Sequence, residues 1–235
     1  MNSTYILVMK HGALGDMVLA TAAFAAIRAQ FPDAHITLLT TKPFAQLMAQ
    51  SPYFNAVVVD EKPRLFDVAG IRRLREILNQ QRWTWVIDVQ NSSRTRRYPW
   101  LFKRPWPKIS GAARGISHPR PAHDVTKHAI TNLQAQLATL GIEMGALPDI
   151  SWMTSPDPVA LPTPYALLVP GGAAHRPEKR WPTDHYTQLA TRLAERGMTP
   201  VLIGTNAEAS VLSSIAAQVP KAVNLCGKTS IAQLA

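Results

Sequence analysis

The sequence contains one cysteine, Cys226, so a disulfide framework and a cysteine-based zinc site are both excluded. No Asp-x-Asp pair occurs, so a metal-bridged nucleotide sugar is not indicated. The longest nearly uncharged apolar run, 17–27, is too short to span a bilayer, which needs about 20 residues. The N-terminus lacks the basic region of a signal peptide. These absences predict a soluble cytoplasmic protein.

Positive charge is concentrated in one segment. Residues 62–127 carry 15 basic and 4 acidic residues, a net charge of +11, whereas the rest of the chain has a net charge of −1. Such a segment indicates an anionic partner, which could be nucleic acid, an anionic membrane surface or a phosphorylated substrate. A solvated loop without a partner is the alternative.

Strand and helix patterns alternate along the first part of the chain, which predicts an α/β fold with parallel strands covered by helices. The expected strands are 5–9, 36–39, 56–59 and 83–89, and the expected helices are about 16–30, 44–50, 68–80 and 125–140. Five prolines between 94 and 121 predict that this basic stretch is irregular.

A second alternation follows a proline-rich segment, 145–164, which we interpret as a linker. Its expected strands are 165–169, 201–203 and 222–225, and its expected helices are 184–196, 207–218 and a start at 230. We therefore predict two domains, 1–155 and 156–235, in which the second pattern is incomplete.

The loop His11-Gly12-Ala13-Leu14-Gly15-Asp16 joins the first strand to the first helix. Its glycines allow close approach to a ligand, and the helix start favours anions. It lacks the Gly-x-Gly-x-x-Gly fingerprint, and the second strand ends at Thr40-Thr41 without an acid, which argues against a nicotinamide oxidoreductase. Asp16 is a candidate general base, or an ordinary acid in the first turn of a helix.

Two loops of the second alternation also follow strands. The first carries Gly171, Gly172, Ala173 and Ala174, and then Lys179 and Arg180, which suit a diphosphate leaving group. Glu208, in the second loop, could accept hydrogen bonds from ribose hydroxyls or be a solvated acid in a first helical turn. Gly227-Lys228-Thr229 is not a phosphate loop, because Ala222 stands where that motif needs glycine.

Together these motifs resemble glycosyltransferase family 9, the lipopolysaccharide heptosyltransferases. The resemblance extends along the whole chain and rests on Lys10, Gly15 to Val18, Thr21, Ile27-Arg28, Phe31 to Ala34, Val86 to Asp88, Pro170-Gly171, Lys179 to Pro182, Leu225 and Gly227 to Ser230. It implies a GT-B fold with two doubly wound Rossmann-like domains facing a cleft. The family's later Asp-Thr-Gly-Pro-type loop does not occur here, so we expect a chain truncated at its C-terminus, whose second domain is incomplete and which could be inactive alone.

The resemblance also implies a reaction: inverting transfer of a heptose from ADP-heptose to a lipopolysaccharide core acceptor, without metal or cofactor. Asp16 matches the catalytic base, and the donor-binding residues would be Gly171, Gly172, Ala173, Ala174, Lys179 and Glu208. The candidate acceptor-binding residues are Gly12, Gly15, Lys62, Arg64, Arg94, Arg97 and Arg120. Peripheral contact with the cytoplasmic face of the inner membrane is expected, and nucleic acid is not.

Three departures from the family pattern leave alternatives. Lys10 replaces a common arginine, and Ala173 and Ala174 replace hydroxyl residues at the donor phosphates, so another nucleotide sugar is one alternative. A catalytically incomplete binding module for anionic lipid or glycan is another.

Overall fold

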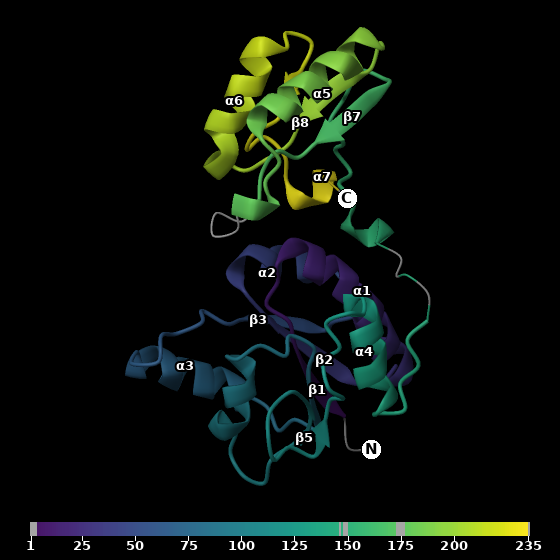
Figure 1. The fold of residues 1–235 in the computed structure, drawn as a ribbon. Coiled ribbons are helices and arrows are strands. Elements are labelled where there is room, and N and C mark those ends of the chain that lie inside the picture. Colours follow the sequence, from purple (N-terminus) through teal and green to yellow (C-terminus); the bar gives the residue numbers. More distant parts are fainter. Residues whose placement is uncertain (1–3, 146, 148–149, 173–176, 235) are drawn as a thin grey trace. The chain divides into compact units, whose positions relative to one another are not determined.

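The computed structural model describes residues 4–145, 147, 150–172 and 177–234. The chain divides into two compact units, Met1–Met153 and Thr154–Ala235 (Figure 1). The division falls inside the proline-rich segment 145–164. No helix in the described part of the chain has the length and apolar character needed to cross a membrane.

The first unit contains a parallel sheet of six strands in the order β3-β2-β1-β4-β5-β6. The strands are β1 (Tyr5–Met9), β2 (His35–Thr40), β3 (Ala56–Val59), β4 (Trp85–Asp88), β5 (Lys108–Gly111) and β6 (His118–Pro119). Strand order reverses between β1 and β4, which is the topology of a doubly wound Rossmann-like sheet.

Helices cover both faces of this sheet. The helices of the first unit are α1 (Leu14–Gln30), α2 (Lys42–Met48), α3 (Val68–Leu78), α4 (Ala129–Ala138) and the 3₁₀ helices η1 (Thr95–Leu101) and η2 (Ser151–Met153). Figure 1 shows α1 and α4 on one side of the sheet and α3 on the other. The buried alanines of α1 lack bulk, so this helix can approach its neighbours closely.

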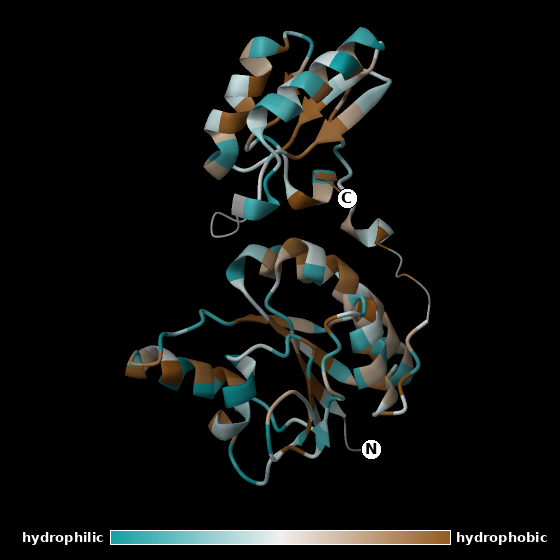
Figure 2. Cartoon of the chain, viewed as in Figure 1, coloured by the Kyte–Doolittle hydropathy of each residue, from teal (hydrophilic) through white to brown (hydrophobic). Residues whose placement is uncertain are grey.

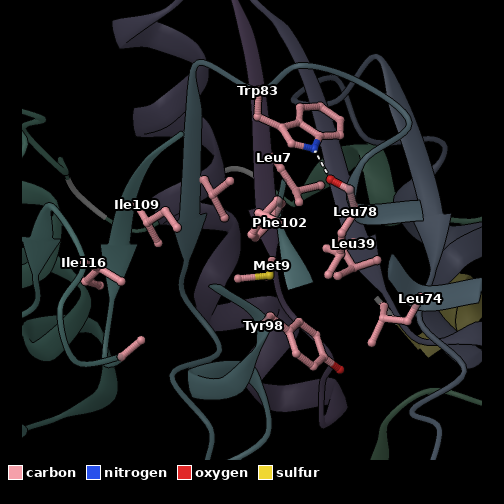
Figure 3. Close-up of a cluster of buried hydrophobic side chains, with 12 residues drawn as sticks. Leu7, Met9, Leu39, Leu74, Leu78, Trp83, Tyr98, Phe102, Ile109 and Ile116 are labelled. Atoms are coloured by element: carbon pink, nitrogen blue, oxygen red, sulfur yellow. Dashed lines mark hydrogen bonds between the residues drawn. The ribbon is translucent and has the colours of Figure 1, made fainter. Parts of the chain in front are cut away.

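The core between α3 and the sheet explains why the sequences of the central strands are continuous apolar runs (Figure 3). Leu7 and Met9 of β1 pack with Leu74 and Leu78 of α3. Trp83 closes this cluster, and its Nε1 donates a 2.8 Å hydrogen bond to the carbonyl oxygen of Leu78. Because both faces of β1 are covered, the strand lacks the polar alternation of a half-exposed strand.

The second unit has a parallel sheet of three strands, β7-β8-β9. These are β7 (Tyr165–Leu168), β8 (Thr199–Leu202) and β9 (Val223–Asn224), and the helices are η3 (Pro177–Lys179), α5 (Thr183–Glu195), η4 (Asn206–Glu208), α6 (Ala209–Gln218) and α7 (Ile231–Leu234). Its core joins Leu168 and Leu202 to Ala190, Leu212 and Ile215. Figure 2 shows hydrophobic residues concentrated on the strands.

The prediction that the basic stretch 94–121 is irregular was wrong. This stretch forms η1, β5 and β6, and Ile109 and Ser110 of β5 are buried. Two strands of four and two residues are too short to show a periodic pattern. Pro105 and Pro107 precede β5 and do not remove a hydrogen bond from it.

The helix predicted at 125–140 also begins later, at Ala129. Asp124 Oδ1 accepts hydrogen bonds from the backbone N–H and the hydroxyl of Thr126, which holds residues 124–126 in a turn. The ring of His128 then accepts from the N–H of Ile130 and caps the helix.

Candidate active site

The candidate site of the first unit lies at the carboxyl ends of β1 and β4. Lys10 to Asp16 follow β1, and Gln90 and Asn91 follow β4. The two strands are neighbours where the strand order reverses, which is where open α/β sheets bind their ligands. The fold thus brings together two segments that are about 75 residues apart in the sequence.

Asp16 lines a cavity of about 380 Å³ at this position. It stands in the first turn of α1 and its side chain is exposed, so it is open to a ligand. A Cβ atom at Gly15 would meet nothing within 4 Å, so the backbone before Asp16 is uncrowded. The polar side chains that share the cavity are Lys10, Gln90, Asn91, Arg96, Arg120, His123 and Asn132.

Lys10 is the buried cationic residue in the cavity of Asp16. Its side chain is only 8% exposed, and burial lowers its pKa, while the carboxylates of Asp16 and then Asp88 act in the opposite direction. Asp88 is itself buried at the end of β4, and burial raises its pKa although the N–H groups of Asn91 and Gln90 donate to its Oδ1 at 2.9 and 3.0 Å. The amine of Lys10 and the carboxylates of Asp16 and Asp88 therefore interact at the carboxyl ends of β1 and β4.

Arg96 and Arg120 are held near each other in the same cavity. Burial lowers the pKa of Arg120, and the positive charge of Arg96 lowers it further. Arg120 is anchored by its backbone N–H, which donates to the carbonyl of Gly111 at 2.8 Å. Two guanidinium groups that repel each other form a favourable place for an anion.

A second cavity, of about 490 Å³, contains Gly12, Lys62 and Arg94 of the predicted acceptor residues. Gly12 has a φ of +109°, and a Cβ atom there would overlap the ring of Phe44. Glycine is therefore required by both backbone conformation and space. Lys62 is held at its backbone by a 2.8 Å hydrogen bond to Asp60 Oδ1.

The helix η1 explains how the arginines are distributed. Arg94 and Arg97 line a third cavity, of about 290 Å³, whereas Arg96 lines the cavity of Asp16. A 3₁₀ helix has three residues per turn, so side chains at i and i+3 share one side and the intervening residue does not. Arg64 is exposed in the turn before α3 and is not among the residues lining these three cavities.

The cavity of Asp16 contains the predicted acceptor residue Arg120 and also groups that the sequence did not assign to it. Arg96 belongs to the basic cluster of the sequence, but only the 3₁₀ conformation of η1 determines that its side chain faces the cavity of Asp16. The sequence pattern predicted no role for Lys10, which also lines this cavity. His123 and Asn132 come from the segment around α4, and no sequence signal connected them to Asp16.

A buried polar network lies behind the loop. His11 Nε2 is 2.9 Å from Asp60 Oδ2, and the hydroxyl of Tyr98 donates to the same oxygen. Burial would raise the pKa of Asp60, but hydrogen bonds from His11, Tyr98 and the Lys62 N–H outweigh it and hold that pKa below its usual range. Burial and the bond to Asp60 raise the pKa of Tyr98. The network links the loop after β1 to the end of β3 and to η1.

The predicted donor residues lie in the second unit, after β7 and β8. The Gly172 carbonyl accepts hydrogen bonds from Arg180 Nε at 3.2 Å and Nη2 at 2.6 Å, and Lys179 is exposed at the end of η3. A Cβ atom at Gly171 would lie 2.8 Å from Glu208 Cγ, so these two loops are in close contact. Ala173 and Ala174 lie outside the described residues.

Glu208 caps the start of a helix, which agrees with the alternative prediction of an acid in a first helical turn. Its Oε2 accepts from the backbone N–H of Thr205 at 2.9 Å and from the Thr205 hydroxyl at 2.6 Å, which completes a capping box. The bond from the Thr205 hydroxyl is the main cause of a lowered Glu208 pKa, and Arg180 contributes. The carboxylate is therefore ionised and fixed beside Gly171.

Comparison with known proteins gives a consistent result. Residues 120–235 match the model of glycosyltransferase family 9 (heptosyltransferase). Lipooligosaccharide heptosyltransferase 2 of Haemophilus influenzae is 23% identical over 96% of this chain and 72% of its own length. Lipopolysaccharide heptosyltransferase 2 of Salmonella typhimurium is 24% identical over 97% of this chain and 72% of its own.

Solved structures show the same fold. A family 9 glycosyltransferase from Veillonella parvula has a TM-score of 0.75 and 21% identity, covering 98% of this chain and 71% of its own. The E. coli ADP-heptose lipopolysaccharide heptosyltransferase II has a TM-score of 0.68 and 20% identity, covering 98% and 75%. The two Rossmann-like units are those of a GT-B fold, which confirms the predicted class. The chain is similar to members of glycosyltransferase family 9 along almost its whole length, and it is a glycosyltransferase.

Proposed function

We propose that this glycosyltransferase moves a heptose from ADP-heptose to a lipopolysaccharide core acceptor, with inversion and without a metal ion, at the cytoplasmic face of the inner membrane. The exposed Asp16 carboxylate in a cavity that also holds Lys10, Arg96 and Arg120 carries this proposal. The names of the curated relatives support heptose transfer. An E. coli heptosyltransferase solved with ADP-2-deoxy-2-fluoro heptose, 19% identical with a TM-score of 0.70, supports the choice of donor.

The proposed step is a single displacement. Asp16 takes the proton from an acceptor hydroxyl as that oxygen attacks the anomeric carbon of the donor. The new carbon–oxygen bond forms on the face opposite the bond to the phosphate oxygen, which breaks and releases ADP with that electron pair. Inversion follows because the attacking and leaving oxygens occupy opposite faces.

Lys10 supports this step by its position. Its buried side chain interacts electrostatically with the carboxylate of Asp16, which places a cationic group beside the proposed base. Arg96 and Arg120 supply cationic groups for the phosphates or carboxylates of an acidic acceptor. General base catalysis of this kind contributes about 10²–10⁴-fold to a rate.

The donor would bind to the second unit. Lys179 and Arg180 provide positive charge for the two phosphates, and the glycines at 171 and 172 allow the backbone to approach them. Glu208 Oε2 is occupied by the cap, and we propose that the same carboxylate accepts from a ribose hydroxyl through its remaining lone pairs.

Asp16→Asn is the test of the base. We expect kcat to fall by about 10²–10⁴-fold with little change in donor affinity. Asp184→Asn is the matched control, because Asp184 is also an exposed acid in the first turn of a helix. If both variants lose the same small amount of activity, Asp16 is only a helix-terminal acid and the assignment is wrong.

Calorimetric titration with ADP, UDP and GDP tests the donor. We expect ADP to bind most tightly and Lys179→Ala to weaken its binding. A preference for UDP or GDP would mean that the donor carries a different sugar from heptose, and it would leave the assignment of the fold unchanged. A protein that neither transfers nor hydrolyses the donor but binds anionic glycan or lipid would instead be a binding module.

A further inference from the structure

The turn that leads into α3 exposes three large apolar side chains within four residues. Leu65 is 63% exposed, Phe66 is 91% exposed and Val68 is 78% exposed. Phenylalanine is usually among the most buried residue types, and here its whole ring faces outward. Figure 2 shows hydrophobic residues at the outer end of α3, away from the sheet. We refer to residues 63–68 as the apolar turn.

Local hydrogen bonds hold the apolar turn in this conformation. The N–H of Asp67 donates to the carbonyl of Arg64 at 3.0 Å, and Asp67 Oδ1 accepts from the N–H of Gly70 at 2.8 Å. Arg94 Nη1 donates to the carbonyl of Pro63 at 2.8 Å, which ties the turn to η1. A Cβ atom at Gly70 would lie 2.7 Å from Pro63 Cβ, so the backbone is closely packed underneath.

This anchoring means that the exposure of Phe66 is a feature of the fold. Its neighbour Asp67 is the N-cap of α3, and Pro63 is fixed from the other side. A collapsed turn that buried the ring would break these bonds. The apolar side chains are therefore presented at little further entropic cost, as a preorganised contact surface requires.

The surroundings of the apolar turn are positively charged. Lys62 precedes it in the sequence, Arg64 lies within it, and both side chains are exposed. Leu65 also lines the third cavity, whose arginines are Arg94 and Arg97. Residues 62–97 carry nine basic and three acidic residues, a net charge of +6.

We propose that the apolar turn inserts Phe66 and its apolar neighbours into the interface of an anionic bilayer, with the flanking cations at the level of the lipid headgroups. Apolar insertion and electrostatic attraction act together in such binding. Charge favours this partner over a second copy of the chain, because two like-charged turns repel each other. The inference specifies the membrane contact of the proposed function, since a core acceptor is attached to lipid.

Vesicle flotation tests this docking with neither donor nor acceptor present. Wild-type protein should float with vesicles of phosphatidylcholine and phosphatidylglycerol, more weakly with phosphatidylcholine alone, and less as salt increases. Val68→Asp and Phe66→Ser should each reduce binding at least about tenfold. Val125→Asp is the matched control, because Val125 is 85% exposed in the same unit and outside the apolar turn.

Wild-type protein that does not float, or Phe66→Ser and Val68→Asp variants that float as well as Val125→Asp, would overturn the proposal. If sedimentation without lipid shows dimers that are lost in Phe66→Ser, the partner of the apolar turn is a second copy of the chain and not a bilayer. Transfer to a deacylated, water-soluble acceptor should be unchanged in the turn variants. If that transfer fails even in wild type while flotation follows the prediction, the proposed function is wrong and the lipid contact stands.

Discussion

Replacing Tyr98 by phenylalanine removes one hydrogen bond from the buried network behind the site. The Tyr98 side chain is 3% exposed and Asp60 is 1% exposed, so water does not readily take the place of the lost hydroxyl. The ring volume is retained, so no large cavity forms. We therefore expect the cost to be that of one hydrogen bond to a buried charge, about 1.5–3 kcal/mol of unfolding free energy.

The pH dependence of this loss follows from Asp60. Its pKa is lowered in the folded state, so the network contributes its full stability above the ordinary pKa of a carboxyl group and loses it as pH falls through the folded value. Tyr98→Phe removes one of the hydrogen bonds that lower this pKa. The stability difference between wild type and variant should be constant near neutral pH and shrink in acid.

Tryptophan fluorescence during urea unfolding is a suitable assay. Five of the six tryptophans lie in the first unit, and Trp181→Phe removes the one in the second. In that background the signal reports the unit that contains Tyr98. A loss of 1 kcal/mol corresponds to a fall of about 2–4 °C in melting temperature for a unit of this size, which thermal unfolding can check.

A double-mutant cycle with Asp60→Asn decides whether the bond is the cause. The two substitutions should be non-additive, because each removes part of the same interaction. Additive effects, or a Tyr98→Phe variant as stable as the parent, would refute the reasoning.

Three further substitutions test other parts of the structure. Leu78→Ala, at a fully buried position of α3, should cost about 2–5 kcal/mol in urea unfolding, and a cost below 1 kcal/mol would mean that the cluster in Figure 3 relaxes around it. Arg28→Lys should cost about 2 kcal/mol in the same assay, because the guanidinium donates to four backbone carbonyls and to Asn55 Oδ1, a fork that lysine cannot reproduce. Gly171→Ala should displace Glu208 and weaken ADP binding in calorimetry, and unchanged affinity would separate Glu208 from the donor site.

Several elements were predictable because each depends on local pattern. Strand Ala56–Val59 and the start of α3 at Val68 lie where the sequence placed them, and the other strong elements differ by a few residues at their ends. The segment after β4 was missed because β5 and β6 are defined by pairing with neighbours and are too short to carry a period. The seven residues of η1 are likewise too few to show a helical period, so the sequence did not predict this 3₁₀ helix.

The sequence by itself determined the alternation of strands and helices, the concentration of positive charge and the position of Asp16 at the start of a helix, because composition and local spacing carry these properties. Only the tertiary structure decided which cations share a cavity with Asp16. Arg96 and Arg120 meet there, while Arg94 and Arg97 do not, because strand pairing and the three-residue turn of η1 set the direction of each side chain. The exposure of Phe66 was likewise decided by the fold, since the hydrogen bond from Arg94 Nη1 to the Pro63 carbonyl joins the apolar turn to a segment distant in the sequence.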